Sequence, residues 1–244
     1  MSFLYNEILF RPIFNLLVFI YNNLPGSDFG LAIVLLTIII RLAFTPLSIK
    51  SLISQRELSK LQPKIRELQE KYKNNKQLLG QATMELYKEH KINPFSGCLP
   101  LIIQLPVLLA LYKALSAGLK PESLSYLYPF IHNPGLIKEM AFGFINLAKG
   151  APLLAVIAGL LQWFQSKQAM SLQTSTSLNE PESPALKINR QMLYFFPVMV
   201  IIIAWNLPAG LVIYWVVSTI FSIFEQVYVN QKYKQNTPKL VASS

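Results

Sequence analysis

Long apolar stretches alternate with polar segments along this chain, and residues 29–49 form the clearest of them. They read FGLAIVLLTIIIRLAFTPLSI and carry a single charge, Arg41. At ~1.5 Å of rise per residue, a helix of this length matches the thickness of the hydrocarbon core of a bilayer. The pattern predicts a membrane-spanning helix with Asp28 as its N-cap. Pro46 is expected to kink this helix, because proline cannot complete the backbone hydrogen bond to Leu42.

Four further apolar stretches of helical length follow the first. They predict spans at about residues 95–115, 151–166, 190–206 and 211–229. The predicted fold is therefore all-α: a polytopic membrane protein in which five transmembrane helices make up a core that covers residues 26–230.

Residues 50–93 interrupt the apolar pattern with a strongly charged segment. They hold ten Lys or Arg and five Glu, which gives a net charge of +5. Apolar residues recur at helical spacing from Leu58 to Tyr72 and again from Leu79 to Leu86. This spacing predicts two amphipathic helices folded into an antiparallel hairpin. The simpler alternative is a solvated charged loop that serves only as a topology signal.

The remaining segments are predicted to lie outside the spans. Residues 1–25 carry apolar positions at helical spacing interrupted by polar ones, which favours an amphipathic helix on the membrane surface; the alternative is a short extra span. No removable signal peptide is expected there, because no basic segment precedes an apolar core. The apolar pieces of residues 117–150 are too short to span and are expected at the interface. Residues 169–186 predict a flexible linker, and residues 231–244 a short, basic, disordered tail.

Composition supports a membrane protein and argues against an enzyme. The chain has 244 residues, of which 52% are hydrophobic and only 14% charged, whereas a soluble domain carries about 25% charged residues. Its one cysteine, Cys98, cannot form an internal disulfide or a zinc site alone. No HExxH, GxSxG or Walker motif is present. Neither catalysis nor a metal or cofactor is expected.

The distribution of basic residues predicts the orientation. Residues 50–93, 167–190 and 232–239 together hold sixteen Lys or Arg, and the segments on the opposite side of the predicted spans hold five. Because cytoplasmic loops carry the excess of Lys and Arg, the N-terminus is expected outside and the C-terminus in the cytoplasm.

Polar residues inside the predicted spans gather toward the cytoplasmic side. They are Arg41, Thr45, Ser48, Gln104, Gln162, Gln165, Tyr214, Ser218, Ser222 and Glu225. The pattern predicts a water-filled cavity that is open to the cytoplasm and closed to the outside. For the hydroxyl groups the alternative is simple helix–helix hydrogen bonding, and for Arg41 it is snorkelling to the near interface. Glu225 is interpreted as an interfacial anchor.

Four motifs in order give the chain a resemblance to a known family. They are LTIIIRLAFTPLSIKS, LQPKIRELQEKYK, NPFSGCLPLIIQLPVLLALYKAL and NLPAGLVIYW, and the resemblance extends from about residue 5 to 235. The chain resembles the YidC/Oxa/Alb family of membrane protein insertases. It looks like the minimal form, without the large external domain. It lacks the lipobox cysteine that this form often carries, and its tail is shorter than the ribosome-binding tails of mitochondrial relatives.

The resemblance implies a mechanism and a set of site residues. Five spans would surround a hydrophilic groove in which Arg41 is the positive charge. Thr37, Gln104 and Tyr214 match groove or substrate-contact positions of the family, and the polar pattern adds Ser218 and Gln162. A substrate's transmembrane segment would follow an apolar surface on the spans at 95–115 and 190–206.

The resulting hypothesis is an insertase in the plasma (inner) membrane of a bacterium. It would take hydrophobic segments of nascent membrane proteins through the groove into the lipid bilayer, with Arg41 attracting acidic flanks. A ribosome or targeting receptor at residues 50–93 and a Sec-type translocon are further partners to consider. The alternatives are a small-solute transporter and a non-catalytic scaffold for membrane assembly.

Overall fold

The computed structural model describes residues 2–93, 99–118, 125–135, 137–171 and 184–236. Their helices are α1 (Ser2–Tyr5), the π-helical η1 (Asn6–Phe10), α2 (Arg11–Asn23), α3 (Phe29–Lys60), α4 (Gln62–Lys71), α5 (Lys76–Glu89), α6 (Leu99–Gly118), α7 (Pro152–Ser171), α8 (Pro184–Asn206) and α9 (Ala209–Asn236). Two short strands, β1 (Met140–Ala141) and β2 (Ile145–Asn146), pair antiparallel. The all-α prediction is confirmed apart from this small hairpin, which the apolar pattern did not indicate.

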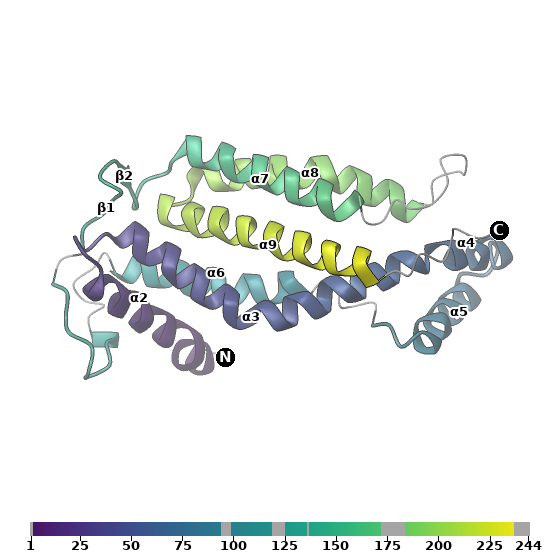
Figure 1. Cartoon of the computed structure of the whole chain (residues 1–244), viewed down its shortest axis with the longest axis horizontal. Coiled ribbons are helices and arrows are strands. Elements are labelled where there is room, and N and C mark those ends of the chain that lie inside the picture. Colours follow the sequence, from purple (N-terminus) through teal and green to yellow (C-terminus); the bar gives the residue numbers. More distant parts are fainter. Residues whose placement is uncertain (1, 94–98, 119–124, 136, 172–183, 237–244) are drawn as a thin grey trace.

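Helix α9 occupies the centre of the bundle. It packs against α3 on one side and against α7 on the other, while α8 pairs with α7 and α6 lies beside α3 (Figure 1). Helices α2 and α6 complete the layer that contains α3. Helices α4 and α5 contact each other and lie beyond one end of the bundle, opposite the β1–β2 hairpin (Figure 1).

Two helices of the described chain are long and apolar enough to cross a membrane, namely Phe29–Lys60 and Ala209–Lys232. Shorter apolar stretches, Gln104–Ser116 and Leu193–Asn206, lie within α6 and α8. Helix α7 carries several glutamines in its second half, which lower its hydropathy. The prediction of five spans therefore has direct support for two helices, and the other three spans stay a prediction.

Several helix ends differ from the sequence prediction. Helix α3 continues through Pro46 to Lys60, and α4 begins one residue after Leu61, with Pro63 in its first turn. Proline favours that position because its fixed φ suits a helix start and its missing N–H would be unpaired there. The first arm of the predicted hairpin therefore consists of the end of α3 and of α4. The prediction of one helix missed this break because the apolar stripe continues across it.

Helices extend into the two polar segments that were predicted as a tail and a linker. Helix α9 continues to Asn236, so the prediction of a disordered tail is wrong for residues 231–236; residues 237–244 lie outside the described residues. Helix α7 ends at Ser171 and α8 begins at Pro184, which narrows the predicted linker to residues 172–183, also outside the described residues. A polar segment that continues a packed helix of the bundle is stabilised as a helix by that packing. The polar composition of the segment alone does not reveal this stabilisation.

Loops at the β-hairpin end of the bundle are hydrogen-bonded to the ends of the helices. Asp28 caps α3, as predicted: its Oδ1 accepts from the Leu31 N–H at 2.9 Å, and its Oδ2 accepts from the Phe142 N–H at 2.5 Å. The turn between α8 and α9 is held by a backbone contact, because the Ala209 N–H donates to the Lys149 carbonyl at 2.8 Å. This end of the bundle is thus joined by the Asp28 carboxylate and by a backbone hydrogen bond.

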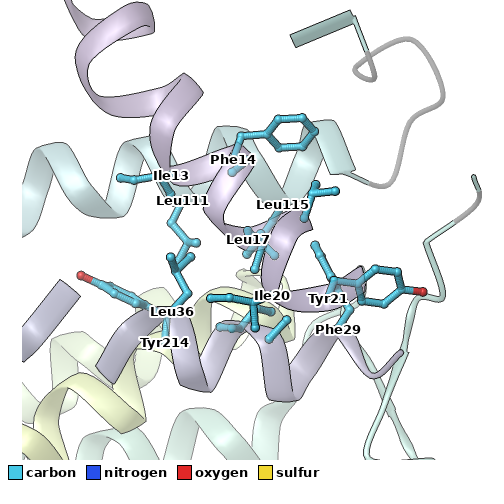
Figure 2. Packing of buried hydrophobic residues seen from close by; sticks show 14 of the residues in the cluster. Ile13, Phe14, Leu17, Ile20, Tyr21, Phe29, Leu36, Leu111, Leu115 and Tyr214 are labelled. Atoms are coloured by element: carbon cyan, nitrogen blue, oxygen red, sulfur yellow. The ribbon is translucent and has the colours of Figure 1, made fainter. Parts of the chain in front are cut away.

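An apolar core forms where α2, α3, α6 and α9 meet. Phe14, Leu36 and Leu111 from three of these helices are almost completely buried there, and Figure 2 shows Tyr214 at the edge of the cluster with its hydroxyl directed away from it. Helix α2 therefore has a face packed against the bundle. The expected surface helix at residues 1–25 keeps an exposed apolar side, with Phe3 74% and Phe19 52% exposed.

Helices α7 and α8 approach each other closely through small residues. Ala155, Ala158, Val200 and Ala204 are fully buried between them. At Gly159 a β-carbon would overlap with the Ile201 side chain and lie 3.2 Å from the Pro197 carbonyl oxygen. A glycine suits this position because the Ile201 side chain and the Pro197 carbonyl leave no room for a methyl group.

We expect Gly159→Ala to lower the stability of the protein. Overpacking costs about 1–3 kcal/mol, which outweighs the ~1 kcal/mol that alanine gains over glycine in a helix. Gly80→Ala in α5 is the matched control, because its β-carbon would meet nothing within 4 Å. Thermal unfolding in detergent should show a lower midpoint for the first variant and an equal or higher one for the second. Equal midpoints for Gly159→Ala and the wild type would contradict the close packing.

Candidate functional site

Three polar side chains from three helices meet inside the bundle. Arg41 of α3 donates from Nη2 to Oε1 of Gln104 on α6 at 3.1 Å. Gln104 in turn donates from Nε2 to the Tyr214 hydroxyl of α9 at 2.8 Å. We call Arg41, Gln104 and Tyr214 the polar network. It joins residues 63 and 110 positions apart in sequence.

The donors and acceptors of each side chain explain its position in the polar network. The amide of Gln104 offers both an acceptor and donors, so one side chain can bridge a guanidinium and a phenol. Tyr214 is 2% exposed, and its ring belongs to the apolar cluster while its hydroxyl meets Gln104. Arg41 has five N–H donors, and Gln104 accepts from one of them. The network thus presents a cation held by neutral partners.

A second polar contact lies further along the same two long helices. Ser48 follows Arg41 by seven residues, two helical turns, so both side chains leave the same face of α3. Its hydroxyl donates to Oε2 of Glu225 on α9 at 2.8 Å. Glu225 is 6% exposed. The interpretation of Glu225 as an interfacial anchor is therefore wrong, because its carboxylate is buried between α9 and α3.

Two of the other predicted site residues, Thr37 and Gln162, lie apart from the polar network, whereas Ser218 adjoins Tyr214. Thr37 is fully buried, and its hydroxyl donates to the Ile33 carbonyl of its own helix at 2.6 Å. Gln162 donates to Gln165 at 3.1 Å and accepts from the Trp215 indole N–H at 3.4 Å, which places it between α7 and α9. Ser218 is buried one turn beyond Tyr214 on the same face of α9. The residues that were predicted to line one cavity thus make several distinct polar contacts.

Sequence reasoning missed the pairing of Ser48 with Glu225. The signal was present in the spacings, because Ser48 shares a face with Arg41, and Glu225 shares a face with Tyr214 eleven residues earlier. What the spacings did not contain is which helices face each other. Chemically, the assembled side chains can attract and hydrogen-bond a polar or anionic group. Among the described residues, no cluster of three metal-ligating side chains occurs.

Comparison with known proteins gives consistent matches over almost the whole chain. The family model described as 60Kd inner membrane protein matches residues 19–236, which include the polar network. The "Membrane protein insertase YidC" of Fusobacterium nucleatum is 32% identical over 95% of this chain and 99% of that protein. The "Membrane protein insertase YidC 1" of Listeria monocytogenes is 37% identical over 88% of this chain and 68% of its own length. The Legionella pneumophila relative is 36% identical, and the match covers 37% of that longer protein.

Proposed function

Because the chain belongs to the 60Kd inner membrane protein family, the YidC/Oxa insertases, we propose that Arg41, Gln104 and Tyr214 line a hydrophilic groove for substrates. The chain is a non-catalytic membrane protein insertase of an inner membrane. Its proposed substrates are hydrophobic segments of nascent membrane proteins with short hydrophilic flanks. Thr37, Ser218 and Gln162 are proposed to shape the walls around the groove.

One observation carries this proposal: a guanidinium lies within an apolar helix and is hydrogen-bonded to a neutral amide. An arginine at the centre of a membrane helix costs about 2.5–3.5 kcal/mol on insertion scales, so it is retained where it serves a site. A cation that is not in contact with a carboxylate still attracts an incoming anion. An acidic residue in a substrate flank has that chemistry.

The proposed mechanism uses charge first and apolar burial afterwards. The hydrophilic flank enters from the cytoplasm, and Arg41 attracts its acidic residues more strongly than in bulk water, because the groove has a lower dielectric. The hydrophobic segment then leaves sideways into lipid. Burial of apolar area at roughly 25 cal/mol per Å² supplies the driving force.

Exposed apolar side chains on two helices suit the second stage. Among the side chains of α6 that the structure describes, the most exposed apolar ones are Leu105, Leu109 and Tyr112. Those on α8 include Tyr194, Phe195, Val198 and Ile202. We propose that a substrate segment passes along these faces before it enters the lipid. A hydrophobic segment can exchange contacts with such a surface at little cost, since the side chains resemble lipid tails.

The cytoplasmic partners are proposed from charge. Residues 50–93, which include α4 and α5, carry the excess of Lys and Arg that would meet ribosomal RNA or a targeting receptor through phosphate contacts. A Sec-type translocon is a further proposed partner. The same charge asymmetry supports the proposal that the N-terminus lies outside and the C-terminus in the cytoplasm of a bacterium.

Reconstitution tests the proposed function. The purified protein in liposomes should insert a short single-span substrate with an acidic flank, measured as protection of the flank from external protease. Empty liposomes provide the background. Insertion no higher than this background, by protein shown to be folded, would overturn the proposal. Solute counterflow into the same vesicles would instead support a transporter, and crosslinks from position 214 only to mature proteins would support a scaffold.

A further inference from the structure

Glu225 contributes a buried carboxylate that the proposed mechanism does not use. It is 6% exposed and is contributed by α9, the central helix of the bundle. The Ser48 hydroxyl of α3 donates to its Oε2 at 2.8 Å. Its Oε1 is buried and accepts no hydrogen bond from the described residues. Burying a carboxylate costs free energy unless an opposite charge or hydrogen bonds compensate for the lost hydration.

Arg41 is an opposite charge whose field acts on Glu225. The two groups attract each other without direct contact: the guanidinium hydrogen-bonds Gln104, and the carboxylate accepts from Ser48. Arg41 and Ser48 share a face of α3 and are ~10.5 Å apart along the axis, a distance that the long arginine side chain partly covers. Thr45 lies between them, but its hydroxyl proton is donated to the Arg41 carbonyl at 2.9 Å.

We propose that Glu225 is the resident counter-charge of Arg41 and that it sets the charge preference of the insertase for substrate flanks. This inference rests on the proposed function. Together the two groups make the site neutral overall, with its positive end toward Gln104. An acidic flank therefore meets an attractive charge that is partly balanced, so it can be bound and then released. A basic flank is tolerated because Glu225 offsets the repulsion from Arg41.

Ser48 is a positioning residue in this arrangement. Its hydroxyl holds the carboxylate against α3, on the face that also carries Arg41. Without that hydrogen bond, the carboxylate can turn toward the cytoplasmic end, and its field at Arg41 weakens. Ser48→Ala should therefore shift the charge preference in the same direction as removal of the carboxylate, but by less.

The test uses three single-span substrates that differ at one flank position, which is Asp, Asn or Lys. Each is inserted by proteoliposomes that contain wild type, Glu225→Gln or Ser48→Ala. Glu225→Gln should raise the ratio of Asp-flank to Lys-flank insertion by roughly three- to tenfold, because the site gains a net positive charge. Glu85→Gln, an exposed position in α5, makes the same change in total charge and should leave the ratio unchanged.

The double variant Arg41→Ala/Glu225→Gln adds a stricter check. Arg41→Ala alone leaves a net negative site and should lower the ratio below that of the wild type, whereas the double variant is neutral again and should return the ratio toward the wild-type value. An unchanged ratio in Glu225→Gln, while the wild type inserts substrate, overturns the role of Glu225 and leaves the insertase intact. Failure of the wild type to insert any substrate would instead overturn the proposed function.

Discussion

Replacement of Arg41 by alanine is expected to reduce insertion of an acidic-flanked substrate by roughly tenfold or more. Two opposite charges about 4 Å apart at an effective dielectric of 20 attract each other by about 4 kcal/mol, and even a third of that energy corresponds to a tenfold change. The variant also leaves Glu225 without its counter-charge, so that an acidic flank is repelled. Protease protection in proteoliposomes measures the loss.

The lysine variant separates charge from geometry at the same position. Arg41→Lys keeps the positive charge but loses the planar guanidinium, so it should retain more activity than Arg41→Ala. Lys73→Ala in the exposed turn between α4 and α5 controls for loss of one positive charge elsewhere and should insert like the wild type. If Arg41→Lys and Arg41→Ala lose equal activity, the guanidinium geometry matters more than its charge.

Asn15→Ala is expected to destabilise the protein by about 2–3 kcal/mol. Asn15 is 1% exposed, and its amide Nδ2 donates to the Tyr126 carbonyl at 3.0 Å while its Oδ1 accepts from the Tyr128 N–H at 2.7 Å. Arg11 Nε also donates to the Tyr126 carbonyl, at 3.2 Å, so the variant mainly leaves the Tyr128 N–H unpaired. An unpaired polar group that is shielded from water costs ~1–3 kcal/mol, beyond the lost hydrogen bonds.

Chemical unfolding in detergent, followed by circular dichroism, measures this loss. Asn22→Ala is the matched control on the same helix, because Asn22 makes one exposed hydrogen bond, to the His132 carbonyl at 2.6 Å. It should cost less than about 1 kcal/mol. Limited proteolysis within residues 125–135 should also accelerate in Asn15→Ala alone. Equal unfolding midpoints for the two variants would show that Asn15 does not anchor this loop.

The helices that hold the site could be located from the sequence with some accuracy. Helix α3 begins at Phe29 after its Asp28 cap, as the local pattern indicated, because capping and apolar runs are local properties. The break between α3 and α4 at Leu61 and the continuation of α9 to Asn236 were not anticipated. The position of these helix ends depends on packing against neighbouring helices. In a charged segment the apolar stripe is too weak to indicate them from the sequence.

The candidate site was predicted in its residues but not in its contacts. The polar pattern selected Arg41, Gln104 and Tyr214, which the structure joins by hydrogen bonds. The pattern also grouped Gln162 with them, and the family resemblance added Thr37. The Thr37 hydroxyl donates within α3, and Gln162 lies against Trp215. A periodic pattern identifies which residues share a face of one helix. It cannot show which face of another helix lies opposite.

The sequence by itself determined the class of protein, the apolar helices and their polar faces, since hydropathy and helical period are properties of the chain alone. It also carried the motifs of the family to which the chain belongs. Only the tertiary structure decided that Glu225 is buried against Ser48 and that Gln104 bridges Arg41 and Tyr214. Contacts between distant segments depend on how α3, α6 and α9 pack, and packing is settled by side chains from all three helices at once.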